Sequence, residues 1–427
     1  MTAPSAPLAA FLADRGLADL DRTVHPEDEM LAFGLPLFCG APGLAEVEYY
    51  RSGLLAHEAL AQVLTARFGS VAATPSLLDF ASGFGRTTRF LVRELPAERI
   101  HVTEIKPEAV AFQHRQFGVT GTVTTTDPAS LAPGRRFAAV WAASFFTHLP
   151  RTTFLPWLER LWSLVEEGGV LAFSVHGEGL VPPGRALEAD GFLFERVSES
   201  TRLDLDSYGS SWVSEGFVAQ ALAEVSGGRA SWRRIPRGLW HFQDLYLVTA
   251  APHEAAGLPF ERGPWGFLEG ADALPDGRVR LAGWVAEPGQ APPRVVVSVA
   301  GGPWVEAAPG LARPEISQVD PDMRAGDWLL VLPVERAPRA EDVVLAKVVG
   351  ATGRELLLFA GRLDTAALLC RAKAAGEAVA AARAELGALR AEVEALQGRL
   401  AWMQASRFWR LRERWFGWKR RLGLRSW

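Results

Sequence analysis

The sequence predicts an α/β fold, a mostly parallel sheet layered by helices, followed by a small all-β sandwich and a long C-terminal helix. Residues 1 to about 252 alternate helical and strand patterns, which indicates the layered sheet. From 255 to 362 the pattern changes to short β-rich runs separated by Pro, Gly and Asp, which favours an antiparallel sandwich. From Leu368 to Met403, apolar residues recur at alternating steps of four and three, as in a coiled coil.

These patterns divide the chain into five segments. They are an N-terminal extension (1–44), the α/β domain (45–252), the sandwich (255–362), the coiled coil (364–405) and a basic amphipathic tail (406–427). The sandwich strands are expected at 278–285, 294–300, 328–334, 343–349 and 355–360. The coiled coil calls for a partner helix, which favours a homo-oligomer, although one long helix packed on its own domain fits the same pattern.

Composition and charge limit the class of protein to which the chain can belong and the kinds of partner that it can bind. Hydrophobic residues make up 48% and charged residues 22% of the 427-residue chain, as in ordinary globular proteins. The net charge is −4, but residues 407–427 hold eight Lys/Arg and one Glu, so the body is acidic and a nucleic-acid partner is not expected. No uncharged apolar run reaches 18 residues, and the first residues lack the basic start of a signal peptide, so neither a membrane span nor a secretion signal is expected.

Cysteine and histidine usage points to a reducing compartment without a structural metal. The two cysteines, Cys39 and Cys370, fall in different segments, so a disulfide framework is not expected. No Cys/His cluster has zinc-binding spacing, and no metal site is predicted. A cytoplasmic location fits these features best.

The segment 76–91, SLLDFASGFGRTTRFL, carries the first chemical signal. A short apolar strand is followed by a turn with Gly83 and Gly85 and then by a helix start, which places backbone N–H groups beside a ligand site. Nicotinamide-binding folds use the same device. Their fingerprint needs a third Gly where this chain has Thr88, and it does not need the acid Asp79 before the turn.

The following segments continue the pattern. A strand at 100–105 carries Glu104 near its end, nineteen residues after Gly85, where a carboxylate can bind both hydroxyls of a ribose. The next strand ends at Asp127, and a fourth strand at 137–143 leads into the loop 144–150. A helix at 154–165, the pair Gly168–Gly169 and a strand at 170–175 follow.

Together these residues resemble the class I S-adenosylmethionine-dependent methyltransferases over about residues 45–250. Asp79, Gly83 and Gly85 match the family's first motif, with Ala81 in place of its first Gly, and LERLWSLVEEGGVLAFS resembles its helix, Gly pair and fifth strand. The resemblance implies S-adenosylmethionine as cofactor and a seven-stranded sheet whose last strand is antiparallel. Two closing β segments, 231–234 and 239–249, can complete that sheet.

The resemblance also assigns roles to individual residues. It implies that Gly83 and Gly85 lie against the methionine part of S-adenosylmethionine, that Glu104 binds its ribose and that Asp127 lies near its adenine. The acceptor loop would then be Ser144–His148. The predicted cofactor-binding set is Asp79, Ala81, Gly83, Gly85, Glu104, Asp127 and Ser144.

Several of these residues have a second interpretation. Glu104 fits a helix-cap acid, and Asp79 fits a turn cap. His148, the catalytic candidate, is suited to take a hydroxyl proton or to bond loop backbone. Gln243 and Asp244 would face either the sheet edge or the acceptor, and Tyr49–Arg51 would either cover the cofactor or pack between helices.

The remaining segments bear on the acceptor. The sandwich loosely resembles modules of bacterial enzymes that act on cell-surface glycans, with Trp284 either in its core or serving as a sugar platform. The tail 406–423 resembles the ends of bacterial glycosyltransferases and methyltransferases from polysaccharide-assembly clusters. Its aromatic stripe beside Arg/Lys fits peripheral contact with the inner membrane, or docking on an acidic surface.

Three functions follow from these readings. The favoured one is O-methylation of a sugar or glycan intermediate in cell-surface polysaccharide assembly, with a small-molecule or glycan acceptor. The alternative is a catalytically inactive methyltransferase-fold scaffold in a membrane-associated glycan-assembly complex. The third is a nicotinamide-dependent enzyme, which Thr88 and the Gly168–Gly169 pattern disfavour.

Overall fold

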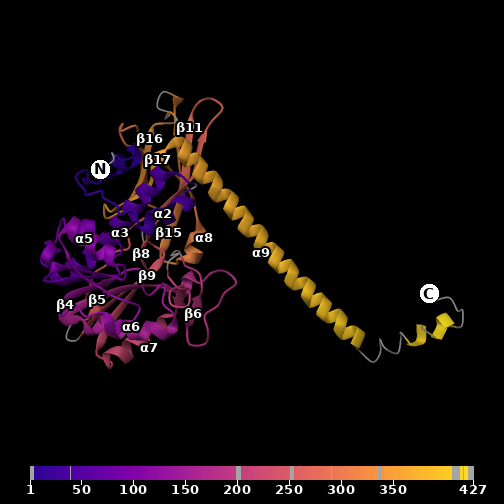
Figure 1. Cartoon of the computed structure of the whole chain (residues 1–427). Coiled ribbons are helices and arrows are strands. Elements are labelled where there is room, and N and C mark those ends of the chain that lie inside the picture. The colour runs from indigo at the N-terminus through magenta and orange to yellow at the C-terminus, as the bar shows by residue number, and fades with distance from the viewer. Residues whose placement is uncertain are drawn as a thin grey trace. The chain divides into compact units, whose positions relative to one another are not determined.

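A computed structural model describes residues 4–38, 40–198, 203–250, 254–289, 291–334, 339, 341–405, 414–416 and 418–421 (Figure 1). The chain forms two compact units, residues 1–367 and 368–427, and each is described by itself. The first unit contains a helix-covered sheet and two smaller antiparallel sheets.

The main sheet has a parallel part that runs β3-β2-β1-β4-β5. Its strands are β1 (Leu77–Phe80), β2 (Ile100–Glu104), β3 (Thr120–Val123), β4 (Phe137–Ala142) and β5 (Val165–Gly177). The strand β9 (Gln243–Ala250) pairs antiparallel with β5, and β8 (Ala230–Leu239) pairs antiparallel with β9. The parallel Rossmann-like order and the antiparallel strand β9 therefore agree with the predicted fold.

The predicted count of seven strands is too low, because the sheet has nine. The two additional strands, β6 (Phe192–Glu195) and β7 (Ser210–Val213), form a short antiparallel pair. The strand β7 joins the main sheet only at His176 and Gly177 of β5. Each has only four residues, which is too short for a sequence pattern to reveal a period.

Helices cover both faces of the main sheet. The helices of this part of the chain are α1 (Ala6–Asp14), α2 (Glu29–Leu37), α3 (Pro42–Phe68), α4 (Thr88–Leu91), α5 (Pro107–Phe117), α6 (Arg151–Ser163) and α7 (Glu215–Ser226), with short helices η1 (Ala97–Arg99), η2 (Pro128–Ser130) and η3 (Glu178–Leu180). Of these, α1 and α2 pack on α3 rather than on the main sheet. Trp141 of β4 lies in the core cluster that includes Leu60 of α3, whereas Val140 lies in the cluster that includes Leu158 of α6. Because successive side chains on a strand alternate between faces, both sides of β4 are buried.

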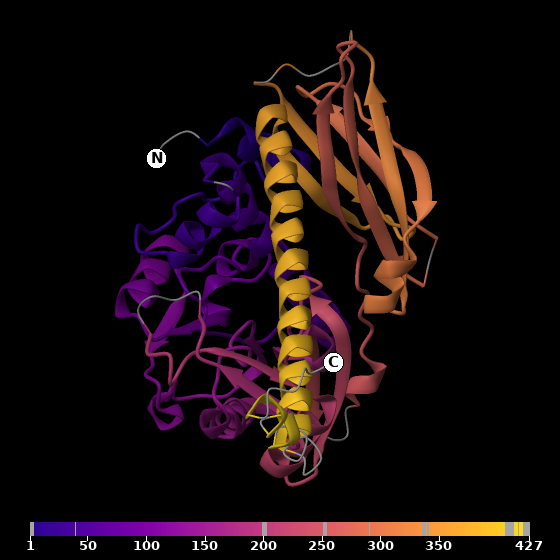
Figure 2. The ribbon, with the colours of Figure 1, turned by 90° about the vertical axis from the view of Figure 1, so that its right-hand side faces the viewer.

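Two four-stranded antiparallel sheets follow the main sheet (Figure 2). One runs β10 (Trp265–Ala273), β11 (Val279–Pro288), β15 (Met323–Leu332) and β14 (Ala308–Ala312); the other runs β13 (Val305–Glu306), β12 (Arg294–Val299), β16 (Val343–Val349) and β17 (Glu355–Arg362). The helices η4 (Ala255–Gly257) and α8 (Pro314–Val319) flank them. The five expected strand runs are present, while β10, β13 and β14 are additional. Trp284 is 4% exposed and packs with Met323, so it is a core residue.

The N-terminal extension is part of the packed body. Leu8 and Phe11 of α1 share a core cluster with Leu357 of β17. The ammonium of Lys347 on β16 lies 2.9 Å from a carboxylate oxygen of Asp14 and 3.0 Å from one of Glu355. These contacts fix α1 to the β-sandwich, so residues 1–44 and the sandwich belong to one unit.

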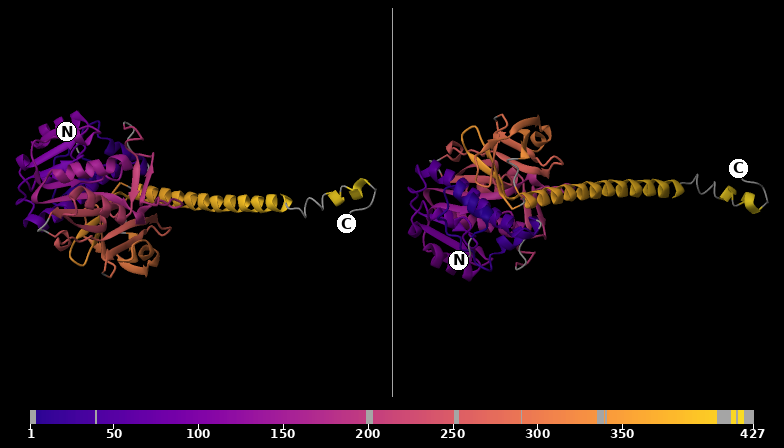
Figure 3. Two further views of the ribbon diagram at one scale, coloured as in Figure 1. Left: turned by 90° about the horizontal axis from the view of Figure 1, so that it is seen from below. Right: turned by 90° about the horizontal axis from the view of Figure 1, so that it is seen from above.

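The second unit contains most of α9 (Leu363–Ala405), which Figure 3 shows as one unbroken helix. Leu386, Leu389, Val393 and Leu396 are 49–54% exposed along it. Within the tail, residues 414–416 and 418–421 are helical, and the rings of Trp415 and Trp418 lie 5.7 Å apart. Cys39 lies outside the described part of the chain, and so do residues 406–413, 417 and 422–427 of the predicted tail. No helix among the described residues is long and apolar enough to cross a membrane.

Candidate functional site

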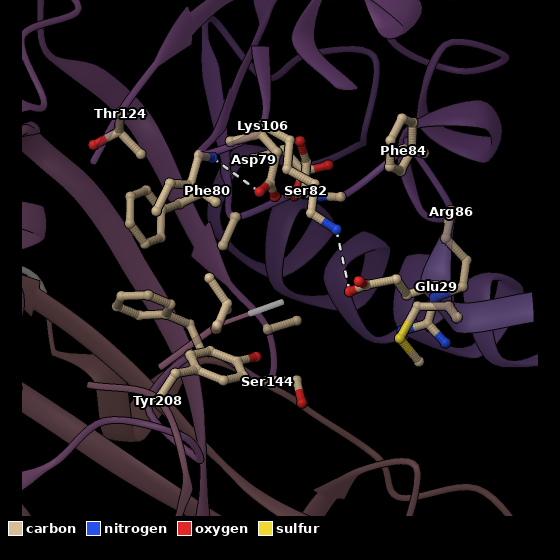
Figure 4. Close-up of a pocket in the computed structure, with 18 of the residues that line it drawn as sticks. Glu29, Asp79, Phe80, Ser82, Phe84, Arg86, Lys106, Thr124, Ser144 and Tyr208 are labelled. Carbon is tan, nitrogen blue, oxygen red and sulfur yellow. Dashed lines mark hydrogen bonds and ion pairs between the residues drawn. The ribbon is translucent and has the colours of Figure 1, made fainter. Parts of the chain in front are cut away.

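A cavity of about 280 Å³ lies where the parallel strands end, and we call it the first chamber (Figure 4). The turn after β1 contributes Asp79, Ala81, Ser82, Gly83 and Phe84. Glu104 and Lys106 at the end of β2, Thr124–Thr126 after β3, Ser144 after β4 and Tyr208 complete much of the wall. Of the predicted cofactor-binding set, the structure thus brings together Asp79, Ala81, Gly83, Glu104 and Ser144.

The turn after β1 is built from residues in the left-handed backbone region. Ala81 has φ +53°, Gly83 φ +58° and Gly85 φ +78°. A side chain in this region costs roughly 1–2 kcal/mol, which explains why the first motif ordinarily has Gly at the position of Ala81. The backbone N–H of Ser82 donates to the carbonyl of Thr103 on β2 at 3.1 Å, which fixes the turn against the neighbouring strand.

The two glycines of the turn have different surroundings. Gly83 lines the first chamber, and a Cβ added there would meet no atom within 4 Å. Gly85 is not among the lining residues, and a Cβ there would lie 2.5 Å from Cε2 of Phe117. Gly85 therefore allows α5 to approach the turn, while Gly83 leaves space beside the cavity.

Glu104 is a buried acceptor at the end of β2. Its Oε2 accepts from the backbone N–H of Gly83 at 3.0 Å, and its Oε1 accepts from that of Ile105 at 2.9 Å. Burial raises the pKa of this carboxyl, and the two backbone hydrogen bonds oppose the rise. A carboxylate held at a strand end beside a glycine turn matches the chemistry that binds the two hydroxyls of a ribose.

Asp79 lies beneath the turn. Burial raises its pKa to about 7, and the nearby carboxylate of Glu104 adds to the rise. The hydroxyl of Thr88 lies 2.9 Å from Oδ2 of Asp79 and 2.8 Å from Oε1 of Gln113. The amide of Gln113 donates to Oγ of Ser82 at 2.8 Å and to the carbonyl of Gly83 at 2.9 Å. Asp79 therefore both borders the cavity and supports the turn through Thr88.

Asp127 lies away from the cavity. Its side chain is exposed, and it accepts from the backbone N–H of Ala129 at 3.0 Å as the cap of η2. The three threonines before it, Thr124–Thr126, line the first chamber instead. Asp127 is thus not among the residues that line the first chamber, and its role near the adenine stays a prediction.

The helix α2 covers the mouth of the first chamber. Glu29 pairs with Lys106 at 3.1 Å, and Figure 4 shows the two side chains reaching toward each other. Met30 and Phe33 of α2 also line the wall. No sequence motif marks these residues, and the mostly apolar run EMLAFGLPL of α2 gives no sign of a binding role.

Tyr49–Arg51 do not line the first chamber. Tyr49 and Tyr50 pack against residues 22–28, whereas Arg51 pairs with Glu48 on its own helix. The hydroxyl of Tyr49 donates to Asp28 at 2.6 Å, and that of Tyr50 donates to the carbonyl of Arg22 at 2.9 Å. Arg51 makes two hydrogen bonds with the carboxylate of Glu48, at 2.7 and 3.1 Å.

Ser144 stands at a strained position with φ +54° and is held by a small network. Its backbone N–H donates to Oγ of Ser174 at 2.7 Å, and the amide of Gln243 donates to its hydroxyl at 2.9 Å. Ser174 in turn donates to Oε1 of Gln243 at 2.7 Å. Of the two adjacent candidates on β9, Gln243 therefore faces the site.

Asp244 has a supporting position. Its buried carboxylate lies 2.8 Å from Nη2 of Arg234 and accepts from the backbone N–H of Arg237 at 2.8 Å. These contacts tie the end of β8 to the start of β9. Asp244 does not line either of the two large cavities.

A second chamber of about 340 Å³ adjoins the first. The two share the lining residues Met30, Phe33, Arg86, Ser144 and Trp240. His148 lines only the second chamber. Its Nδ1 lies 2.8 Å from the carbonyl of Gly209, and its ring stacks on Tyr208 at 4.5 Å. The backbone hydrogen bond expected for His148 is therefore present, and Tyr208 connects this ring to the first chamber.

The described residues contain no group of His, Cys, Asp and Glu side chains arranged to hold a metal ion. The parallel sheet, the glycine turn and the carboxylate after β2 define a nucleotide-type cofactor site in an α/β domain. Residues 78–171 match the family model of a methyltransferase domain. The match covers the turn and Glu104, so this part of the chain is similar to a methyltransferase domain.

Several solved structures resemble the chain. The DhpI–SAH complex is 17% identical, with a TM-score of 0.34 over 53% of this chain and 98% of that one. An S-adenosylmethionine-dependent methyltransferase from Clostridium acetobutylicum is 13% identical, with a TM-score of 0.33 over 46% and 91%. The glycopeptide N-methyltransferase MtfA is 17% identical, with a TM-score of 0.30 over 42% and 87%. No curated protein matches the sequence. Because these TM-scores are below 0.5, the family match and the site geometry carry the assignment.

Proposed function

We propose that this protein transfers a methyl group from S-adenosylmethionine to a hydroxyl of a sugar or glycan intermediate in cell-surface polysaccharide assembly. The observation that carries the methyl-transfer part is the pairing of Glu104 with the backbone N–H of Gly83 at the floor of the first chamber. A second chamber of comparable size opens beside it, where an acceptor can lie.

The residues of the first chamber fit the cofactor by their chemistry. When bound, S-adenosylmethionine supplies an electrophilic methyl group on a sulfonium. Glu104 would bind the ribose hydroxyls, and the turn at Gly83 would lie against the methionine part. The pair Glu29–Lys106 would close the mouth and exclude water. The protein's main contribution is alignment of the two substrates.

A hydroxyl acceptor also needs a group to receive its proton, and His148 is the candidate. Because its Nδ1 bonds the carbonyl of Gly209, the neutral ring carries its proton there and Nε2 is the basic nitrogen. The ring lines the second chamber beside Ser144.

Calorimetric titration with S-adenosylhomocysteine tests the cofactor site. The intact chain should bind with micromolar affinity, and Glu104→Ala should weaken binding by about tenfold or more, because a charge-assisted pair of hydrogen bonds is lost. Asp127→Ala is the matched control and should bind within about twofold of the intact chain, since this exposed acid only caps η2. Absence of binding by the intact chain would contradict the proposal.

The sugar and membrane parts are supported by the resemblance of the tail to enzymes of polysaccharide assembly. We expect the protein at the cytoplasmic face of the inner membrane. Deleting residues 406–427 should release it from vesicles of phosphatidylglycerol and leave the affinity for S-adenosylhomocysteine unchanged. Equal vesicle binding by the truncated chain would argue against a membrane role for the tail.

The exposed apolar side chains of α9 support self-association through a coiled coil. Leu386, Leu389, Val393 and Leu396 are spaced by three, four and three residues, and such a series is buried only by a partner helix. In sedimentation, Leu389→Lys with Leu396→Lys should yield monomers, whereas Glu394→Lys, outside the series, should leave the oligomer intact. A monomeric intact chain would contradict self-association.

A further inference from the structure

The turn between β8 and β9 is strained, and it separates the two chambers. Trp240 has φ +53° and His241 φ +62°, and the N–H of Phe242 closes the turn on the carbonyl of Leu239 at 3.2 Å. Such turns ordinarily use Asn and Gly, because side chains in the left-handed region cost roughly 1–2 kcal/mol each. Strain of this kind persists where surrounding contacts impose it and is concentrated at functional sites.

The contacts that impose this conformation come from two parts of the unit. The indole N–H of Trp240 donates to the carbonyl of Ser52 on α3 at 2.8 Å, and the guanidinium of Arg86 lies 5.4 Å from its ring centre. His241 stacks on Trp265 of β10 with ring centres 5.2 Å apart and planes 6° apart. The β-sandwich therefore holds one side of the turn.

The β-sandwich also forms a wall of the second chamber. Trp265, Gly266 and Phe267 of β10 and Leu356 of β17 are lining residues. The rings of Trp265 and Phe267 are only half buried, so they keep surface toward the cavity. The guanidinium of Arg262 just before β10 lies 2.6 Å from the carboxylate of Asp320 before β15 and donates to the carbonyl of Pro236 on β8 at 3.2 Å, which ties this wall to the main sheet.

The polar groups of the second chamber are mostly neutral. Burial lowers the pKa of His176 to about 4 and that of His241 to about 3, so both rings are uncharged near neutral pH. The charged lining residues are Glu48 and Arg51, which pair with each other, and Arg86. The guanidinium of Arg86 donates to the hydroxyl of Ser52 at 2.9 Å and lies 5.4 Å from the ring centre of Trp240. Gln243 and Ser210 add neutral hydrogen-bonding groups. Aromatic faces beside neutral donors and acceptors suit a ring with an apolar face and hydroxyl edges.

We propose that the second chamber is the acceptor site and that the β-sandwich completes it, with Trp265 and Phe267 holding the apolar face of an uncharged sugar ring. The proposal rests on the methyl-transfer function proposed above. Ser144 and Trp240, which line both chambers, then stand between cofactor and acceptor. The sandwich is thus a component of substrate recognition and reaches the acceptor through β10.

Saturation-transfer NMR on the full chain, saturated with S-adenosylhomocysteine, tests the site with methyl glycosides of glucose, galactose, mannose, rhamnose and N-acetylglucosamine. At least one glycoside should receive saturation, and Trp265→Ala should reduce the signal about fivefold or more, as loss of an aromatic platform predicts. Trp304→Ala, in the same sandwich but outside the chamber, is the matched control and should leave the signal unchanged.

Phe242→Ala provides a second variant that does not disturb the core, because this ring is 50% exposed and lines only the second chamber. It should also weaken the glycoside signal while the affinity for S-adenosylhomocysteine stays within about twofold. If S-adenosylhomocysteine binds but no glycoside signal appears, or if both variants retain it, the acceptor site is overturned and the cofactor site stands. Failure of S-adenosylhomocysteine to bind would overturn the underlying function as well.

Discussion

The two chambers are of similar size but are assembled differently. The first takes most of its wall from the ends of the four strands β1 to β4, where a motif of a few residues places Gly83 beside Glu104. The second is bounded by residues as far apart in the chain as Phe33 and Leu356. Local backbone chemistry determines the first chamber, whereas long-range packing determines the second. The first chamber can therefore be predicted from the sequence, whereas the second is seen only in the folded structure.

The largest expected difference between the chambers is in their response to pH. Burial raises the pKa of Asp79 from 3.8 to about 7 in the folded chain. Its stabilising contribution is fully present below about pH 4 and is lost as the pH rises through about 7, a change of roughly 4 kcal/mol. Burial lowers the pKa of His176 to about 4, so its contribution is present above about pH 6.5 and is lost as the pH falls toward 4.

Chemical denaturation from pH 4 to 8 measures these contributions. The difference in unfolding free energy between the intact chain and Asp79→Asn should fall as the pH rises, and that for His176→Gln should rise. Parallel pH profiles for the two variants would show that the chambers do not differ in this respect.

The next largest effect concerns the turn that both chambers share. Asp244→Ala leaves Arg234 without its buried partner and removes the acceptor of the Arg237 N–H. We expect a loss of about 3 kcal/mol in unfolding free energy. Glycoside binding in the second chamber should weaken more than binding of S-adenosylhomocysteine, because β8 and β9 carry the turn. Equal losses of glycoside affinity and of S-adenosylhomocysteine affinity would show that the second chamber does not depend on this turn more than the first.

A smaller effect should distinguish the two glycines of the first motif. Gly85→Ala forces a Cβ against Phe117 in a left-handed conformation, whereas Gly83→Ala adds strain without a clash. Thermal and denaturant unfolding should show Gly85→Ala less stable than Gly83→Ala by about 2 kcal/mol. Gly83→Ala should in turn be the more harmful to S-adenosylhomocysteine binding, since only Gly83 lines the cavity.

The smallest expected effect is a gain in stability. Ala81→Gly relieves the left-handed strain at φ +53° and should stabilise the chain by about 0.5–1 kcal/mol, because glycine's larger entropy in the unfolded chain offsets part of the relief. Denaturant unfolding beside Ala129→Gly, in the exposed helix η2, gives the comparison. A loss of stability would mean that the Ala81 methyl makes contacts worth more than its strain.

The sequence alone predicts the parallel sheet and the sandwich, because periodicity and turn residues are local signals. The antiparallel strand is predicted only through the resemblance to the methyltransferases. The sequence also places Asp79, Ala81, Gly83, Glu104 and Ser144 near one another, since parallel strands end at the same edge. It does not separate Gly83 from Gly85, because only the approach of Phe117 distinguishes them.

Other features depend on contacts between distant segments. Asp127 follows a strand as an adenine-binding acid would, yet it caps η2 while the threonines before it line the cavity. The cover from α2 and the stacking of His241 on Trp265 join residues with no shared motif. The strands β6 and β7 are too short to have a clear period.

The position of α1 has a consequence for synthesis. Asp14 and its partner Lys347 are 333 residues apart in the chain. At about 5–20 residues per second, the ribosome needs roughly 15 to 70 seconds to make the strand that α1 packs against. Over that interval the apolar face of α1, with Leu8, Phe11 and Leu12, has only part of its final cover. The packing of α1 is therefore completed only after the last strands of the sandwich have been made.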